Sequence, residues 1–312
     1  GEYPQVTYVD RDVSLSRKLA QAIEQNRVAI IRGISKSGKT LLVHHTLRYV
    51  NSPRIWISGN LIRDEQALWR ILARTVREST RLEYDISLDQ DSIMNELSLQ
   101  RYCVIVDDFH YVPTKKLRAE LARLFKTFSE NGIPVFVIGV QSPPMRELEE
   151  MPDLVARSLI ITLVNWSEDD LARIGHQGFN NCGFGIANIG SIAQESFGSP
   201  FLMQQLCQIY CTKRVQNNDT KIGYIERVER NQLDEILVQA ANSISYMHTY
   251  TVLIGPDACA SDDLFLRHDG IKFGNLNQMI LYALTGRYPF GAMPLFEVHI
   301  GKLWQRLREV LH

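Results

Sequence analysis

Residues 33–40 of this chain combine glycines, a lysine and a hydroxyl at a spacing suited to holding phosphate. They read G-I-S-K-S-G-K-T, which fits the pattern G-x-x-x-x-G-K-[ST] at every fixed position. Glycines let the backbone curl so that successive amides point at an anion, and a helix that begins there adds its positive end. We therefore expect a phosphate-binding loop made of Gly33, Ile34, Ser35, Lys36, Ser37, Gly38, Lys39 and Thr40.

Two side chains of this loop have separate tasks in nucleotide binding. Lys39 is expected to reach the β- and γ-phosphates, and Thr40 to offer its hydroxyl to Mg²⁺. An apolar run precedes the loop, and a helical run at 41–49, opened by Leu41, follows it. Because the motif forms a P-loop in this strand–loop–helix context, the sequence predicts a protein that binds ATP or ADP with Mg²⁺.

A pair of acids follows a second apolar run, 103–106. Asp107 and Asp108 would lie at the carboxyl end of a buried parallel strand, the edge at which open α/β sheets bind ligands. Asp107 is expected to hold Mg²⁺ through its water shell, and Asp108 to position the attacking water. Asp108 is one methylene shorter than the glutamate that many hydrolytic P-loop proteins carry there, so we expect slow ATP hydrolysis.

Two more residues are candidates for the catalytic group. Gln141, after the apolar run 135–139, could report whether the γ-phosphate is present, and Ser142 is the alternative. Arg157, just before the run 159–163, could act in trans as an arginine finger. The plainer interpretations are a polar loop residue and a surface arginine.

These residues need a sheet to bring them together. Short β-branched runs alternate with amphipathic stretches, which predicts an α/β domain over residues 1–165 with a parallel five-stranded sheet and helices on both faces. The strand at 103–106 is expected to lie beside the strand at 28–32. Strands are expected at 28–32, 55–58, 103–106, 135–139 and 159–163, and helices at 65–80 and 117–130.

The rest of the chain predicts two smaller units. Ser167 and the three acids after it form an N-cap with acids in the first helical turn, which opens a helical lid over 166–239. A winged-helix-like module is expected over 240–312. Its strand-like, helical, turn-rich and final helical stretches are expected at 264–268, 275–284, 286–293 and 295–311.

Composition excludes several classes of protein. With 45% apolar residues, 22% charged residues and a net charge of -1, the chain is globular and has no global field that favours nucleic acid or membrane. Its five cysteines lack the spacing of a zinc site or a disulfide framework, which favours a reducing compartment. We expect a cytoplasmic protein without a membrane partner. Because it opens with Gly1, we expect a processed or excised chain that could lack an N-terminal domain.

Together these motifs resemble the STAND class of signal-transduction NTPases, which is close to the AAA+ ATPases, over nearly the whole chain. The run Y-V-D-R-D at 8–12 looks like the motif that lies near the adenine in these families, which implies nucleotide contacts for Val9 and Arg11. The runs I-W-I-S-G at 55–59 and V-D-D-F-H at 106–110 look like the second strand and the acid-tipped strand. The triplet G-S-P at 198–200 matches the Gly-x-Pro motif of the lid, in which Pro200 opens a helix that faces the nucleotide.

The resemblance also implies a histidine of the winged helix against the β-phosphate of ADP. His268 and His299 both fit, and the sequence does not choose between them. For either residue, a structural or surface histidine is the plainer interpretation.

The resemblance implies a nucleotide-controlled switch. ADP would keep the lid and the winged helix closed, and ATP would support self-association that drives an N-terminal or separate effector protein, in prokaryotic signalling or antiviral defence. The alternative is a DNA-associated AAA+ ATPase, similar to origin-recognition or transposition regulators, whose winged helix binds duplex DNA. Six basic residues against five acids in 262–312 disfavour this alternative. A kinase-like metabolic enzyme is a third reading, but no acceptor-binding motif supports it.

Overall fold

The computed structural model of the chain describes residues 7–80, 89–155, 158–217 and 225–243. Arg157, His268, His299 and the expected winged-helix-like module from residue 244 onward lie outside these residues. The chain divides into two compact units: the first comprises Gly1–Gln208 with Arg214–Val228, and the second Ile209–Lys213 with Glu229–His312. The domain boundaries expected after residues 165 and 239 stay a prediction.

The centre of the first unit is a five-stranded parallel sheet with the order β2-β3-β4-β1-β5. In the register of the sheet, Ile30 of β1 lies opposite Val137 of β4 and Ile160 of β5. The five expected strands are confirmed, each with one further residue. The strands are β1 Val28–Gly33, β2 Arg54–Ser58, β3 Cys103–Asp107, β4 Val135–Val140 and β5 Ser158–Leu163.

The order of the strands corrects one prediction. We expected β3 to lie beside β1, but β4 lies between them and pairs with both. The prediction was wrong because a continuous apolar run shows only that a strand is buried on both faces. Since β4 is as apolar and as buried as β3, this signal cannot rank the two strands.

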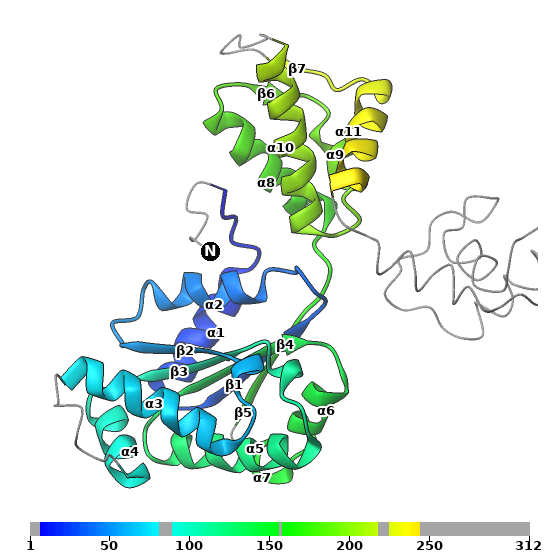
Figure 1. Cartoon of the computed structure of the whole chain (residues 1–312). Helices are drawn as coiled ribbons and strands as arrows, with labels where there is room; N and C mark the ends of the chain where they lie inside the picture. The colour runs from blue at the N-terminus through cyan, green and yellow to red at the C-terminus, as the bar shows by residue number, and fades with distance from the viewer. Residues whose placement is uncertain (1–6, 81–88, 156–157, 218–224, 244–312) are drawn as a thin grey trace, which may run out of the picture. The chain divides into compact units, whose positions relative to one another are not determined.

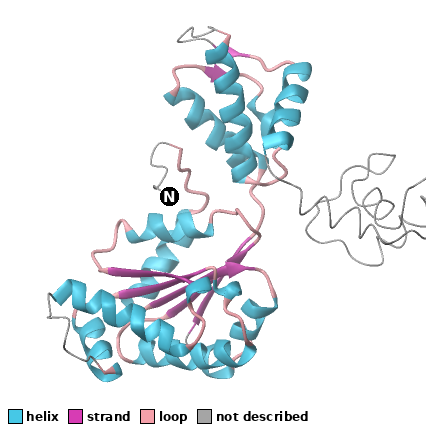
Figure 2. Ribbon diagram, in the orientation of Figure 1, coloured by secondary structure: helices cyan, strands magenta, loops and turns pink. Residues whose placement is uncertain are grey.

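Helices cover both faces of the sheet, as Figures 1 and 2 show. Alternate side chains of each inner strand point to opposite faces. Val28 and Ile30 pack in the cluster with α3 to α7, whereas Ala29 and Ile31 pack in the cluster with α1 and α2. The helices are α1 Val13–Glu24, α2 Lys39–Leu47, α3 Glu65–Thr80, α4 Gln90–Leu99, α5 Lys115–Glu130, α6 Pro143–Glu149 and α7 Pro152–Val155, with 3-10 turns η1 Gly59–Leu61 and η2 Phe109–Tyr111.

The segment after β5 is mainly helical. Ser167 caps α8 by accepting a hydrogen bond from the Asp170 amide at 3.1 Å, and Pro200 is the first residue of α10, as the sequence predicted. A short parallel pair, β6 with β7, was not expected. The elements are α8 Glu168–Asn181, β6 Gly185–Ile186, α9 Ile189–Gln194, α10 Pro200–Gln216, β7 Ile225–Glu226 and α11 Arg230–Ser243. Among the described helices, none is long and apolar enough to cross a membrane.

Candidate functional site

The loop between β1 and α2 contains two glycines that are needed for different reasons. Gly38 has a φ of +93°, a left-handed conformation that favours glycine, and is the N-cap of α2. Gly33 lies so close to β5 that an added Cβ would be 2.6 Å from the carbonyl oxygen of Leu163. The residue types of the motif thus fit both the turn of the loop and its packing against the neighbouring strand.

Lys39 points back over the loop from the first turn of α2. Its ammonium donates hydrogen bonds to the carbonyl oxygens of Ile34 at 2.6 Å and Gly33 at 3.3 Å. The side chain is buried, and burial lowers the pKa of Lys39, while the charges of Asp107 and Asp108 raise it. An ammonium has three N–H donors, so a buried Lys39 that bonds two carbonyl oxygens among the described residues has donor capacity left for an anion in the loop.

Thr40 and Asp107 meet at the carboxyl end of the sheet. The Thr40 hydroxyl donates to Oδ2 of Asp107 at 3.0 Å, and Oδ1 accepts a hydrogen bond from the Asp108 amide at 2.9 Å. Burial raises the pKa of Asp107, while the Thr40 hydroxyl and the Lys39 ammonium act to lower it. The structure therefore places the two expected metal ligands side by side, although β3, which ends at Asp107, is not adjacent to β1, the strand that leads into the loop before Thr40.

Asp108 follows with its side chain half exposed. Its φ is +56°, and the close approach of η1 fixes its backbone, because a Cβ on Gly59 would be 2.4 Å from the Asp108 carbonyl oxygen. The imidazole of His110 lies near its carboxylate, with Nδ1 4.0 Å from Oδ1 of Asp108. Burial lowers the pKa of His110, while Asp108 raises it. Asp108 can therefore reach water beside Asp107.

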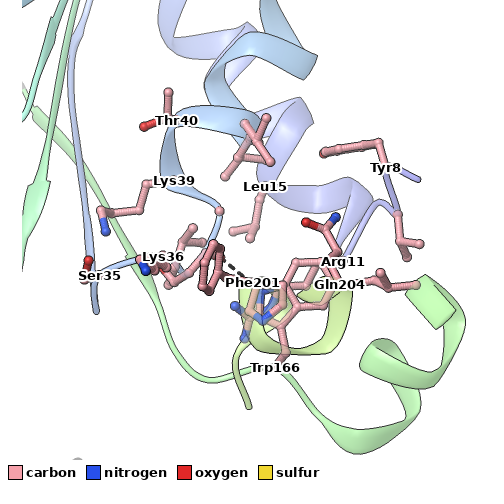
Figure 3. A pocket seen from close by; sticks show the side chains of 18 of the residues that line it. Tyr8, Arg11, Leu15, Ser35, Lys36, Lys39, Thr40, Trp166, Phe201 and Gln204 are labelled. Atoms are coloured by element: carbon pink, nitrogen blue, oxygen red, sulfur yellow. Dashed lines mark hydrogen bonds between the residues drawn. The ribbon is translucent and has the colours of Figure 1, made fainter. Parts of the chain in front are cut away.

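A cavity of about 320 Å³ joins these groups, which is within the size range of small-molecule sites. Figure 3 shows the side chains that line it. The walls come from the N-terminal segment, the phosphate loop, the end of β3 and the residues after β5, all within the first unit. They include Tyr8, Val9, Arg11, Leu15, Ser35 to Leu42, Asp107, Asp108, Val140, Leu163, Trp166, Ile174, Pro200, Phe201 and Gln204.

The N-terminal segment lines the cavity with Val9 and Arg11, and the nucleotide contacts expected of these two residues stay a prediction. The Tyr8 ring stacks on His45 of α2 with the ring centres 4.1 Å apart. Arg11 donates to the carbonyl oxygens of Val164 at 2.5 Å and Asn165 at 2.7 Å. Burial lowers the pKa of Arg11, and the charges of Asp170 and Asp12 raise it. Arg11 thus holds the segment after β5, a task that the sequence did not indicate.

Sequence reasoning missed two aromatic residues that line the cavity, Trp166 and Phe201. The indole N–H of Trp166 donates to the carbonyl oxygen of Ser37 at 3.0 Å, and the Lys36 ammonium lies 3.7 Å from the centre of the Phe201 ring. Phe201 follows Pro200, the one lid residue that the motif did indicate. No local spacing relates these aromatic residues to the loop, because the contacts join positions far apart in the chain.

Gln141 is not brought into the cavity. Among the described residues at the end of β4, Val140 lines the cavity, and the Gln141 side chain is exposed. The amide of Gln141 donates to the Gly33 carbonyl oxygen at 3.1 Å, and the Ser142 hydroxyl donates to the Val140 carbonyl oxygen at 3.0 Å. Gln141 therefore continues the pairing of β4 with β1, and its role as a sensor stays a prediction.

The fold is shared with solved structures at low sequence identity. The ORC1 protein of Aeropyrum pernix, solved in complex with DNA, matches with a TM-score of 0.56 at 12% identity over 98% of this chain and 79% of that chain. A Walker-type ATPase of Pyrococcus abyssi matches with a TM-score of 0.55 at 13% identity over 99% and 91%. A RuvB variant of Thermotoga maritima matches with 0.50 at 15% over 76% and 73%.

These likenesses show the fold. The parallel sheet with its glycine-rich loop between β1 and α2 is the P-loop NTPase fold, and the similar structure from Pyrococcus abyssi is a Walker-type ATPase. The α/β fold class predicted from the sequence is confirmed for the described residues. No protein-family model matches the chain, and no curated protein is similar to it in sequence.

Proposed function

We propose that this chain binds ATP and ADP with Mg²⁺ in the cavity beside residues 33–40 and hydrolyses ATP slowly. The observation that carries the proposal is the convergence of Lys39, Thr40 and Asp107 on one cavity at the carboxyl end of the sheet. A solvated strand end would not bring a buried lysine, a hydroxyl and a carboxylate together behind a curled glycine loop.

The residues present fit a nucleotide and its metal. The Thr40 hydroxyl and the Asp107 carboxylate are 3.0 Å apart and supply the oxygen ligands that Mg²⁺ prefers, so Thr40 would hold the ion directly and Asp107 through its water shell. When bound, Mg²⁺ neutralises charge on the phosphates. Lys39 would exchange the carbonyl oxygens of Gly33 and Ile34 for phosphate oxygens, which makes stronger, charge-assisted hydrogen bonds.

Hydrolysis is assigned to Asp108. Its carboxylate lines the cavity next to Asp107 and is exposed enough to accept a hydrogen bond from water. A residue that accepts a hydrogen bond from water at this place can orient the attacking water. Because the side chain is short and half exposed, it would hold the water loosely, which supports slow turnover.

We also propose that nucleotide controls a conformational switch of the STAND type. Pro200, Phe201 and Gln204 at the start of α10 line the cavity together with the phosphate loop. A nucleotide there would therefore contact both the loop and α10. A ligand shifts a conformational equilibrium only by its differential contacts, and these residues could supply them. Self-association in the ATP state and control of an effector, in signalling or antiviral defence, rest on the family resemblance.

The test compares binding of Mg·ATP by the wild-type chain and Lys39→Ala in a calorimeter. Removing charge-assisted hydrogen bonds should weaken binding by roughly 100-fold. Lys116→Ala is the matched control, because Lys116 lies on α5 with its side chain exposed, away from the cavity, and should bind like wild type. Lys39→Ala binding Mg·ATP as tightly as Lys116→Ala would refute the assignment of the loop.

A DNA-associated ATPase is the second candidate. The observation that favours it is the shared fold with the ORC1 protein, which was solved in complex with DNA. The basic residues considered for this role, at 262–312, lie outside the described residues. Binding of labelled duplex over a salt series separates the candidates: a steep loss of affinity with salt supports a DNA reader, and no binding at moderate salt removes it.

A further inference from the structure

Trp166 connects the phosphate loop to the segment that follows β5. Its indole N–H donates to the Ser37 carbonyl oxygen at 3.0 Å (Figure 3). Its ring also faces the backbone of Gly38, since a Cβ on that glycine would be 4.0 Å from Cζ2 of Trp166. The tryptophan therefore touches the peptide unit between Ser37 and Gly38 from outside the loop.

The backbone of the same residue is tied to the turn before α10. The Trp166 amide donates to the Gly198 carbonyl oxygen at 3.1 Å. Gly198 has a φ of +74°, and a Cβ on it would be 2.9 Å from Cβ of Asn165. Only glycine fits this approach without strain. Trp166 thus bonds the phosphate loop through its side chain and the turn before Pro200 through its backbone.

Arg11 fixes the position of Trp166 from a third segment. Its guanidinium bonds the carbonyl oxygens of Val164 and Asn165, the two residues before Trp166, and lies 5.4 Å from the centre of the indole ring. The segment that carries Trp166 is therefore anchored on two sides. Its indole has a defined direction relative to the loop.

We propose that Trp166 is a positioning residue with two effects. It orients the Gly38 amide for phosphate, and it couples phosphate binding at the loop to the conformation of the turn before α10. A peptide unit is planar, and in its trans form the C=O and the N–H point in opposite directions. The indole that holds the Ser37 carbonyl therefore sets the direction of the Gly38 N–H, which the motif assigns to phosphate. The inference rests on the proposed nucleotide site and adds the residue that couples that site to the lid.

The first test uses Mg·pyrophosphate, which has phosphates and no base. Trp166→Phe keeps an aromatic ring and removes the N–H donor, so binding of Mg·pyrophosphate and Mg·ATP should fall by the same factor, roughly three- to tenfold for one neutral hydrogen bond. Trp69→Phe is the matched control. Trp69 also donates through its indole, to Glu65 at 3.1 Å. It packs in the core cluster with α3 to α7 and does not line the cavity.

The second test measures hydrogen exchange of the amides at 198, 199 and 201–203 in the full chain with and without Mg·pyrophosphate, which lacks the base and ribose that could contact α10 directly. A residue that only packs would change stability, but it would not change the response of these amides to ligand. In wild type and Trp69→Phe their exchange should change on binding, and at saturating ligand this change should be lost in Trp166→Phe. Gly198→Ala should lose it too, because the added methyl group would displace Asn165 and the backbone of Trp166. Its indole N–H donor is kept, so its affinity for Mg·pyrophosphate should fall less than that of Trp166→Phe.

The outcomes separate the two proposals. If wild type binds neither probe, the nucleotide site fails and the coupling fails with it. If wild type binds, but Trp166→Phe matches Trp69→Phe in affinity and in the exchange response, the nucleotide site stands and the coupling is overturned. Should Trp166→Phe fail to fold, Gly198→Ala decides the coupling: an unchanged response of the amides at 198, 199 and 201–203 overturns it, and a lost response with retained pyrophosphate binding supports it.

Discussion

The Thr40 hydroxyl donates a 3.0 Å hydrogen bond to the Asp107 carboxylate, although β4 separates the strand of Asp107 from the strand that leads into the loop. The bond exists because α2 begins at the carboxyl edge of the sheet, where the ends of all parallel strands gather. A hydroxyl and a carboxylate held together at the end of a phosphate loop form a place where a hard cation can bind.

This pair predicts a shared magnesium dependence. Thr40→Ala and Asp107→Asn should each lower the ratio of ATP affinity with Mg²⁺ to that in EDTA by about tenfold, the loss expected for one ligand contact. The double variant should lose little more than either single variant, because both residues serve one ion. Calorimetry in the two buffers measures the ratios. Fully additive losses would show that the residues act independently.

Asp108→Asn should separate binding from hydrolysis. Asparagine tolerates the positive φ at this position, so the backbone should not change. The amide cannot accept a proton as the carboxylate does, and phosphate release should slow by about 10²-fold or more. Affinity for Mg·ATP should match wild type. Unchanged turnover, measured as phosphate release, would remove Asp108 from its proposed role.

Gly33→Ala should destabilise the fold and weaken nucleotide binding together. The added methyl group would meet the backbone of Leu163 at 2.6 Å, and a backbone atom cannot move aside cheaply, so we expect a cost of about 1–3 kcal/mol. Gly190→Ala is the matched control. It lies in α9 with nothing within 4 Å of its added methyl group and should be slightly stabilising. Urea unfolding compares the two; equal stabilities would contradict the packing at Gly33.

Cys103 and Cys182 should react at very different rates with iodoacetamide. Burial raises the pKa of Cys103 to about 12, so at pH 8 roughly one molecule in ten thousand carries the thiolate. The thiol is also inaccessible, whereas Cys182 is exposed. Mass spectrometry of labelled peptides should find Cys182 modified in the native chain and Cys103 only after unfolding. Fast native labelling of Cys103 would mean that β3 is not the buried strand described.

The phosphate loop and the acid pair could be predicted from the sequence because each depends on local order. A strand, a glycine turn and a helix follow one another at residues 28–47, and the acids come directly after an apolar run. The order of β3 and β4 could not be predicted in this way. Both strands are buried on both faces, and tertiary packing of the helices between them decides which strand pairs with β1.

Contacts between segments far apart in the chain could not be predicted from the sequence either. Trp166 and Ser37 are 129 positions apart, and Arg11 and Val164 are 153 apart, so no helical or strand period relates them. The resemblance placed Arg11 near the nucleotide, but its bonds to Val164 and Asn165 and the role of Trp166 could be seen only once the fold brought these segments together. By contrast, Ser167 and Pro200 could be placed at helix starts because capping depends on neighbouring residues.

The most direct measurement of the central claim is a crystal structure of the full chain with Mg·ADP. We predict phosphate oxygens that accept hydrogen bonds from the amides of residues 33–40, with the Lys39 ammonium moved from the Gly33 and Ile34 carbonyl oxygens onto phosphate. Nucleotide bound elsewhere, with Lys39 still on these carbonyl oxygens and the loop empty, would contradict the account.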